Sequence, residues 1–230
     1  MKLRSIQFKI VYRSNHFLSY FMPIYQFQKS PSTKPVNILF YHVPKNAGVT
    51  VEKFFLANNF KEFFGAKSHK AIRNLLKVSP QHFDTSIYSN FLKVDNLYSF
   101  ALTRNPVDRF ISEYRWLIEK SNISTEIAKM DFDKFVEVKL EMVKKDSAHS
   151  GNHFMPQSEF IPKNVTKTFK LEDGLNAALK TVLNDNNFTL NEELNLPKLN
   201  ASKIKKPDVS SHTLQLIQDF YKDDFLRFNY

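Results

Sequence analysis

Two nearly continuous apolar runs, each followed by a turn and an amphipathic segment, dominate the hydrophobic pattern of the chain. The first run occupies 36–43 and the second 97–103. A run without polar alternation is typical of a strand covered on both faces, as the central strands of parallel sheets are. Pro44 ends the first strand, because proline cannot donate to a sheet ladder. After the second run, Asn105 suits the N-cap of a helix and Pro106 its first position.

Apolar residues at helical spacing predict further helices along the chain. The segment 130–143 carries Phe132, Phe135, Val136, Leu140 and Val143 on or near one stripe, which we interpret as core in preference to the wall of an acceptor cleft. A strand over 165–171 precedes a helix with Asp173 near its start. The last segment begins with serine caps and has an apolar face formed by Leu214, Ile217, Phe220 and Tyr221.

The loop after the first run, PKNAGVT at 44–50, has the chemistry of an anion site. Ala47 and Gly48 keep side chains out of the way while the backbone turns, and the first N–H groups of the following helix point back toward the strand end. Lys45 adds a movable full charge. An ordinary turn with a surface lysine explains this segment equally well on its own.

The second unit, LYSFALTRNPVDRFISEY at 97–114, repeats this arrangement. Arg104 stands at the end of the strand and supplies a planar fork for a phosphate. Ser112, about two turns into the helix, can bring a hydroxyl to the same anion. On this helix Phe110, Tyr114 and Leu117 share one face, and we expect Arg109 and Ser112 to lie off it.

The ordered pair PKxxGxT and RNPxxRxxSxY resembles the sulfotransferases that use 3'-phosphoadenosine 5'-phosphosulfate, specifically the carbohydrate branch with the heparan sulfate 2-O- and 6-O-sulfotransferases and their bacterial relatives. The resemblance runs from about residue 36 to 230. It implies that the 3'-phosphate is held by Arg104 and Ser112. It also implies that the 5'-phosphosulfate is held by Lys45, Asn46, Ala47, Gly48, Val49 and Thr50. Asn46 and Val49 stand where threonine is usual, so there only the backbone amide is available.

The resemblance also implies a histidine base between the two motifs, and we expect His69 in that role beside Lys45 as the second catalytic residue. A neutral imidazole suits proton abstraction near neutral pH. His82, on the same segment, is the first alternative base. Glu52, on the first turn of the helix after the loop, is a further candidate, although an acid there more simply complements the helix dipole. His42, next to the loop, is expected to be packed or to support other site residues.

Two later segments resemble family features. HxxPQ at 153–157 makes His153 and Gln157 candidates for acceptor contact, against the alternative of a polar loop that only packs. A Pro-x-x-Asn-x-Ser stretch makes Ser202 and Lys203 candidates for donor binding, against a basic tail on a polar linker.

Composition changes this picture in two ways. A formal charge of +10 implies anionic partners, which suits the donor and an acidic glycan but also nucleic acid or membrane phosphates. The chain has no cysteine, which excludes disulfides and thiolate chemistry.

Residues 1–35 form a basic, aromatic extension without acidic residues, in which no apolar run reaches the roughly 20 residues needed to cross a bilayer. We expect a short strand or helix there, packed on the main domain, and treat a peripheral membrane contact as the second hypothesis.

The sequence therefore predicts an extension over 1–35 and one domain over 36–230, with an α/β fold in three layers, a mostly parallel central sheet and a plan like that of P-loop nucleotide-binding proteins. The function expected is transfer of a sulfuryl group from 3'-phosphoadenosine 5'-phosphosulfate to a carbohydrate hydroxyl, in the cytoplasm or at a membrane surface, with a glycan or other hydroxyl acceptor, no nucleic acid and no metal. The alternatives are an ATP-dependent kinase or NTPase of related fold and a non-catalytic basic protein that binds nucleotides or glycans. A kinase loop would carry its lysine after the glycines, whereas Lys45 precedes Gly48. The donor assignment requires Lys45 and Arg104 to lie within reach of one adenosine.

Overall fold

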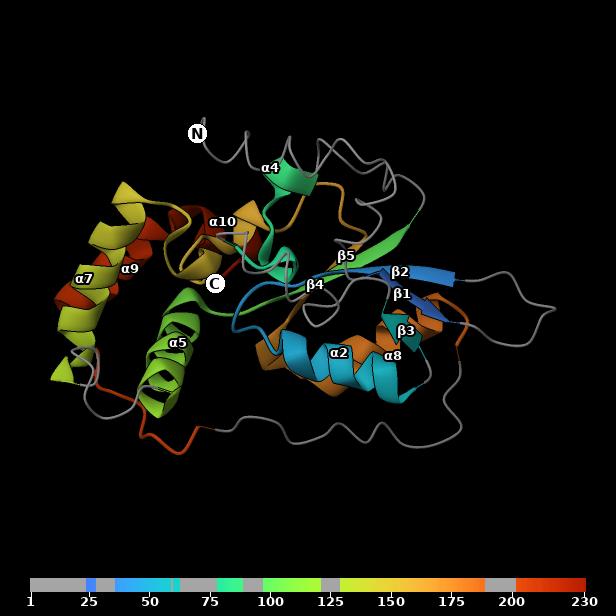
Figure 1. Ribbon diagram of the computed structural model, residues 1–230, viewed down its shortest axis with the longest axis horizontal. Coiled ribbons are helices and arrows are strands. Elements are labelled where there is room, and N and C mark those ends of the chain that lie inside the picture. The colour runs from blue at the N-terminus through green and yellow to red at the C-terminus, as the bar shows by residue number, and fades with distance from the viewer. Residues whose placement is uncertain are drawn as a thin grey trace.

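The computed structural model has a central sheet with helices below it and beyond one end of its strands (Figure 1). The structure describes residues 24–27, 36–58, 60–62, 78–88, 97–120, 129–188 and 202–230. The strands are β1 (Ile24–Phe27), β2 (Val36–Tyr41), β3 (Phe60–Glu62), β4 (Tyr98–Thr103) and β5 (Lys167–Lys170). The α-helices are α2 (Gly48–Ala57), α4 (Thr85–Tyr88), α5 (Pro106–Lys120), α7 (Phe132–Lys145), α8 (Leu175–Asp185), α9 (Ser211–Phe220) and α10 (Lys222–Phe228). Short 3-10 turns are η2 (Pro80–His82), η3 (His149–Asn152), η4 (Gln157–Glu159) and η5 (Leu171–Asp173).

The sheet has five strands in the order β3-β1-β2-β4-β5. β2 pairs in parallel with β4, and β4 in parallel with β5. β1 is antiparallel to both of its neighbours, so the other four strands run in one direction. The register sets Tyr41 opposite Ala101. Because β2 and β4 are parallel neighbours, the loops that follow them leave the same edge of the sheet, as the sequence predicts for a mostly parallel α/β fold.

Apolar side chains cover the sheet on both faces. On one face they pack against α2 and α8, through Ile38, Phe40, Phe100 and Leu102. On the other they meet the segments around residues 78–83 and 148–161 and the end of α10, through Leu39, Tyr41, Val43 and Ala101. The nearly continuous apolar runs are explained by this double coverage, and the three-layer arrangement is confirmed.

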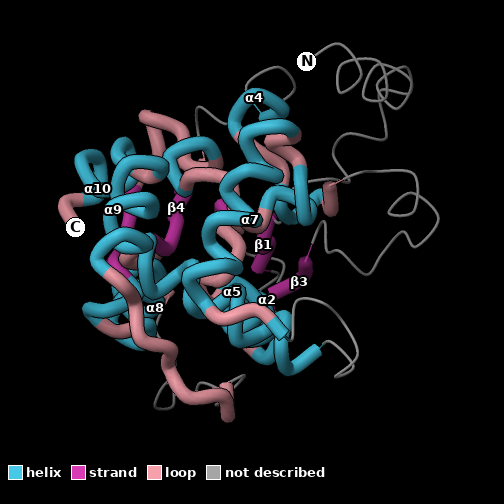
Figure 2. Tube along the Cα trace, turned by 90° about the vertical axis from the view of Figure 1, so that its left-hand side faces the viewer, coloured by secondary structure: helices cyan, strands magenta, loops and turns pink. Residues whose placement is uncertain are grey.

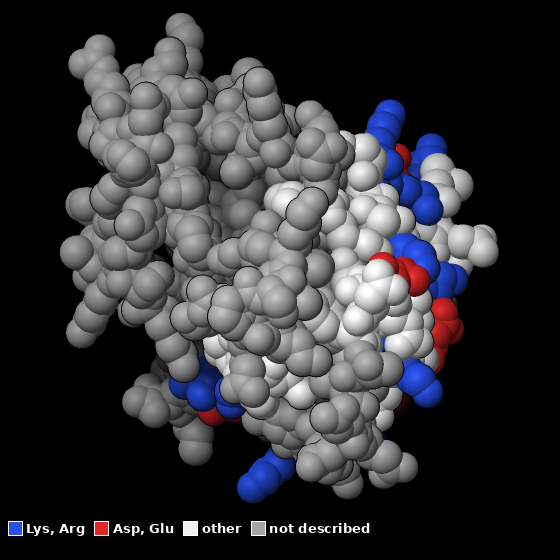
Figure 3. All heavy atoms as spheres, turned by 90° about the vertical axis from the view of Figure 1, so that its right-hand side faces the viewer, with Lys and Arg blue, Asp and Glu red and all other residues white. Residues whose placement is uncertain are grey.

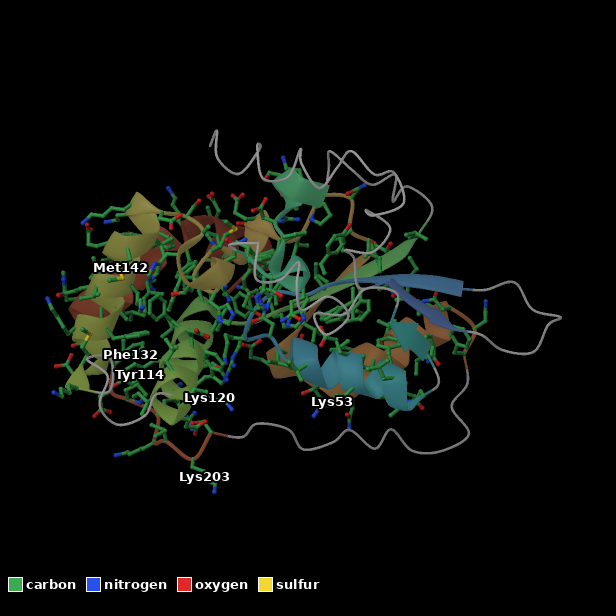
Figure 4. All side chains as sticks on the ribbon, viewed as in Figure 1. Lys53, Tyr114, Lys120, Phe132, Met142 and Lys203 are labelled. Atoms are coloured by element: carbon green, nitrogen blue, oxygen red, sulfur yellow. The ribbon has the colours of Figure 1, made fainter. Side chains whose placement is uncertain are left out.

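Helices α5, α7 and α9 form a separate apolar cluster beyond the strand ends, which faces the viewer in Figure 2. Tyr114 and Phe132 lie between α5 and α7 with ring centroids 5.3 Å apart (Figure 4). The stripe on α7 is therefore core, as expected. On the last segment, Ile217 and Tyr221 of the predicted apolar face are buried and Phe220 packs against the same cluster. Leu214 is the exception: it is 38% exposed, and the neighbouring Thr213 is buried.

Within residues 1–35, the structure describes only β1, an inner strand of the sheet. The remaining residues of that extension lie outside the described ranges. Among the helices of the described part, none is long and apolar enough to cross a membrane. On the face drawn in Figure 3, Lys and Arg side chains of described residues lie interspersed with Asp and Glu.

Candidate functional site

The loop from Pro44 to Ala47 turns the chain from β2 into α2 by using left-handed backbone at two non-glycine residues. Lys45 has a φ of 69° and Ala47 a φ of 61°. The amides of Ala47, Gly48 and Val49 have no hydrogen-bond partner among the described residues, whereas Thr50 N–H donates back to the Ala47 carbonyl at 2.9 Å. Alternating left- and right-handed residues at a helix N-terminus make a concave row of N–H groups that suits an anion.

Gly48 is required by the packing of His42 beneath the loop. A Cβ at Gly48 would lie 2.1 Å from His42 Nε2, well inside van der Waals contact. His42 is itself fixed, because it is buried and its Nδ1 is 2.6 Å from Glu52 Oε1. The expectation of a packed His42 is confirmed, and the loop approaches the helix as closely as it does because residue 48 has no side chain.

The side-chain amide of Gln157 joins the ends of the two strands. Its Oε1 accepts from Asn46 Nδ2 at 2.6 Å and from Arg104 N–H at 2.9 Å, and its Nε2 donates to the Arg104 carbonyl at 2.8 Å. The side chain is fully buried, as is that of Asn46. Asp224, on α10, holds the Gln157 backbone by accepting its N–H at 2.7 Å. Because the amide of Gln157 is buried and fully hydrogen-bonded, it is not available to contact an acceptor. Its role is instead to hold the two motifs in position.

The two predicted anion-binding motifs lie side by side. Arg104 Nη1 donates to the carbonyl of Lys45 at 3.3 Å, so the adjacency that one nucleotide requires is present. Burial lowers the pKa of Arg104, while Asp108 and Glu172 act in the opposite direction. Arg109 fastens the same region, because its Nε donates to the Pro44 carbonyl at 3.1 Å. The expectation that Arg109 lies off the buried face is wrong. The Arg109 side chain is only 2% exposed, because carbonyl oxygens accept hydrogen bonds from its guanidinium group.

Lys45 rests between an aromatic ring and a carboxylate. Its Nζ lies 4.7 Å from the ring centroid of Trp116 and 3.8 Å from Glu113 Oε2. Burial lowers the pKa of Lys45, and the charge of Glu113 opposes that shift. Glu113 and Trp116 were missed in the sequence, although Arg109, Glu113 and Trp116 recur at the i, i+4, i+7 spacing of one helix face.

Three histidine rings form a row under the loop. The His42 and His82 centroids are 5.1 Å apart and those of His82 and His153 4.7 Å, both edge-on. His82, in the middle, is 7% exposed, and burial lowers its pKa well below the ordinary value, with His42 and His153 acting in the same direction. Enclosed in this way, His82 is a poor base for an incoming hydroxyl. His69, the first choice for the base, lies outside the described residues.

The segment from Ser202 to Lys206 runs along the polar side of α5. Ser202 Oγ donates to Glu119, Arg115 Nη2 donates to the Ser202 carbonyl at 2.9 Å, and Lys206 Nζ meets Asp108 at 2.7 Å. Ser112 lies on the same stripe of the helix as Asp108, Arg115 and Glu119. Its hydroxyl has no hydrogen-bond partner in the described part of the chain.

Within that segment, Ser202 contacts Arg115 and Glu119 on the α5 face that also carries Ser112. The Lys203 side chain points away from the helix into solvent (Figure 4). For Lys203, only the backbone N–H, which donates to Glu119 at 2.7 Å, faces α5. The expected contact of the Lys203 side chain with a donor therefore has no support in this arrangement.

A mostly parallel α/β sheet with a basic strand–loop–helix turn at its carboxyl edge is the arrangement typical of proteins that bind nucleotide phosphates. A family model described as the Sulfotransferase family matches residues 32–230. The chain therefore belongs to the sulfotransferase family, which confirms the resemblance seen in its motifs and makes it an enzyme of sulfuryl transfer. A search of curated proteins and a search of solved structures found no match.

Proposed function

We propose that the protein transfers the sulfuryl group of 3'-phosphoadenosine 5'-phosphosulfate to a hydroxyl group of a carbohydrate acceptor. The observation that carries the proposal is the 3.3 Å hydrogen bond from Arg104 to the Lys45 carbonyl, which holds two separate cationic groups at one sheet edge. A nucleotide with phosphate groups at both its 5' and 3' positions suits two such neighbouring grips. The family match supports the reaction type.

In the proposed reaction, Lys45 and the amides of Ala47, Gly48 and Val49 bind the 5'-phosphosulfate end. As the acceptor oxygen attacks sulfur in line, negative charge grows on the departing phosphate oxygen, and these groups stabilise it without having to reorganise. Arg104 and Ser112 bind the 3'-phosphate, away from the reacting atoms. Their binding energy fixes the position of the donor so that its sulfur faces the acceptor.

Binding of adenosine 3',5'-bisphosphate without metal tests the donor assignment. At about 100 times its dissociation constant, a ligand of the native state stabilises it by roughly 2.7 kcal/mol, which a thermal-shift experiment detects. Adenosine 5'-monophosphate, which lacks the 3'-phosphate, is expected to bind more weakly than the bisphosphate. Arg104→Ala should remove most of that difference, because it deletes the group that distinguishes the two ligands.

Transfer of ³⁵S from the labelled donor to panels of polysaccharides, glycolipids and small hydroxyl compounds tests the acceptor class. Labelling of a polysaccharide supports the proposal, and labelling of lipids or small molecules alone refutes its carbohydrate part. Stabilisation by magnesium-ATP alone would instead favour the kinase or NTPase. Donor binding with no transfer to any panel member would favour the non-catalytic binding protein.

A further inference from the structure

Glu113 is a buried carboxylate whose single oxygen atom serves two groups of the site. Its side chain is 2% exposed, and its Oε2 lies 3.0 Å from His153 Nδ1 and 3.8 Å from Lys45 Nζ. A carboxylate is costly to bury unless it is paired and hydrogen-bonded, so this pair of partners explains how α5 tolerates the charge. It also means that the imidazole of His153 and the ammonium group of Lys45 are fixed relative to one another.

The contact with Glu113 determines how His153 presents its ring. An ionised carboxylate only accepts hydrogen bonds, so Nδ1 carries the proton and Nε2 keeps a free lone pair. The backbone of His153 is anchored separately, because its carbonyl accepts from Arg109 Nη2 at 2.8 Å. Trp116 lies on another side, with its ring centroid 5.9 Å away. The imidazole is therefore held in one orientation and one tautomer.

Exposure distinguishes His153 from the other two rings of the row. Its side chain is 18% exposed, whereas His42 is 4% exposed and bonded to Glu52, and His82 lies between the two. Of these three described histidines, His153 alone combines an accessible ring, a carboxylate on Nδ1 and a shared atom with Lys45. General base catalysis requires such a pair: a base that can reach the attacking hydroxyl, here His153, and a second group that orients the base, here Glu113.

We propose that His153, oriented by Glu113, is the general base of the reaction. The proposal rests on the proposed function. His153 Nε2 takes the proton of the acceptor hydroxyl as the acceptor oxygen forms its bond to sulfur. The bond between sulfur and the bridging oxygen breaks, and its electron pair leaves on the 5'-phosphate of adenosine 3',5'-bisphosphate. The oxidation state of sulfur does not change, and His153 afterwards returns its proton to water.

Glu113 acts as a positioning residue that links the base to the donor site. An anion bound in the loop attracts Lys45, which reduces the share of Lys45 in neutralising Glu113. The carboxylate is then free to stabilise the imidazolium that forms when His153 accepts a proton.

Two variants separate a chemical role of His153 from a structural one. His153→Asn keeps an N–H donor where Nδ1 stands, and so preserves the bond to Glu113, but has no atom that accepts the acceptor's proton. His153→Ala leaves space that added imidazole can fill. The matched controls are His212→Ala and Glu159→Gln, which change exposed side chains far from the loop in sequence.

The experiment measures, in the full chain, binding of adenosine 3',5'-bisphosphate by calorimetry and single-turnover release of ³⁵S from the labelled donor, both to an acceptor and to water. His153→Asn should bind the bisphosphate within about twofold of the wild type and lose about a hundredfold or more in rate. Imidazole should restore part of the rate of His153→Ala. Glu113→Gln should lower the rate more than it weakens binding, and the controls should match the wild type.

Several results would overturn the assignment. A His153→Asn protein with most of the wild-type rate shows that the ring only supports Glu113, and one that no longer binds the bisphosphate shows a role in donor binding instead. Loss of rate in His69→Ala, with His153→Asn unimpaired, assigns the base to His69. A wild-type protein that fails to bind the bisphosphate refutes the proposed function itself, and with it this inference, whereas the other outcomes leave the proposed function standing.

Discussion

Replacing Gln157 by leucine removes the side chain that joins the two motifs. Leucine fills a similar volume, but it leaves the N–H and the carbonyl of Arg104 without the partners that Gln157 supplies at 2.9 and 2.8 Å. Each buried backbone group left unpaired costs about 1–3 kcal/mol. The expected loss is therefore about 2–6 kcal/mol in the free energy of unfolding, a large part of the 5–15 kcal/mol typical of a domain. Asn46 loses less, because its Nδ2 still donates to the Leu102 carbonyl at 2.7 Å.

Urea unfolding followed by circular dichroism measures this loss, and calorimetry with adenosine 3',5'-bisphosphate measures its effect on the site. Binding should weaken as well, because Arg104 and the loop are no longer held in register. Gln215→Leu, on the exposed side of α9, is the control and should change stability by less than about 0.5 kcal/mol. Equal stability of Gln157→Leu and the control would refute the reasoning, since it would mean that Arg104 finds other partners at no cost.

Three further predictions concern the same region. Burial lowers the pKa of His82 well below its ordinary value of about 6.5, so the unfolded state binds a proton that the native state does not. The free energy of unfolding should therefore fall below about pH 6.5 by about 1.4 kcal/mol per pH unit, and a His82→Phe protein with the same slope in urea titrations would contradict this. Gly48→Ala should destabilise the protein by about 1–3 kcal/mol, because its Cβ would meet His42, and His42→Ala should relieve part of that cost in a double-mutant cycle; strict additivity would exclude the clash as the cause. Lys45→Ala should lower turnover about 10²- to 10³-fold in ³⁵S transfer, while Lys53→Ala on the exposed side of α2 serves as its control and keeps the wild-type rate; near-normal turnover of Lys45→Ala would remove that residue from the mechanism.

The parts of the fold that depend on local sequence could be predicted. The two apolar runs became β2 and β4 because burial on both faces is visible as missing alternation. The start of α5 followed from its cap, and Asn105 Oδ1 does accept from Val107 N–H at 2.9 Å. The proximity of Lys45 and Arg104 could also be predicted, because both residues follow the carboxyl ends of parallel strands.

The contacts that organise the interior of the site could not be predicted, because they join residues far apart in the chain. Gln157 lies 53 positions from Arg104 in the sequence. Neither segment alone shows that the side-chain amide of Gln157 forms hydrogen bonds with the backbone of Arg104. Arg109 was expected off the buried face because its helical position lies off the stripe of Phe110, Tyr114 and Leu117. The carbonyls of Pro44 and His153, which accept from its guanidinium, make its burial favourable. The role of Glu113 could not be predicted for the same reason, because its partners come from the first loop and from the segment after α7.

The inner position of β1 changes what counts as the core of this enzyme. The family match begins at residue 32, yet residues 24–27 are hydrogen-bonded to strands on both sides. A chain trimmed to the matched region would expose one edge of β2 and deprive β3 of its neighbour in the sheet. Bare strand edges pair readily with other chains, so such a fragment is expected to self-associate even with every motif intact. Recombinant work that sets its boundary by family likeness would discard a strand on which the sheet is built.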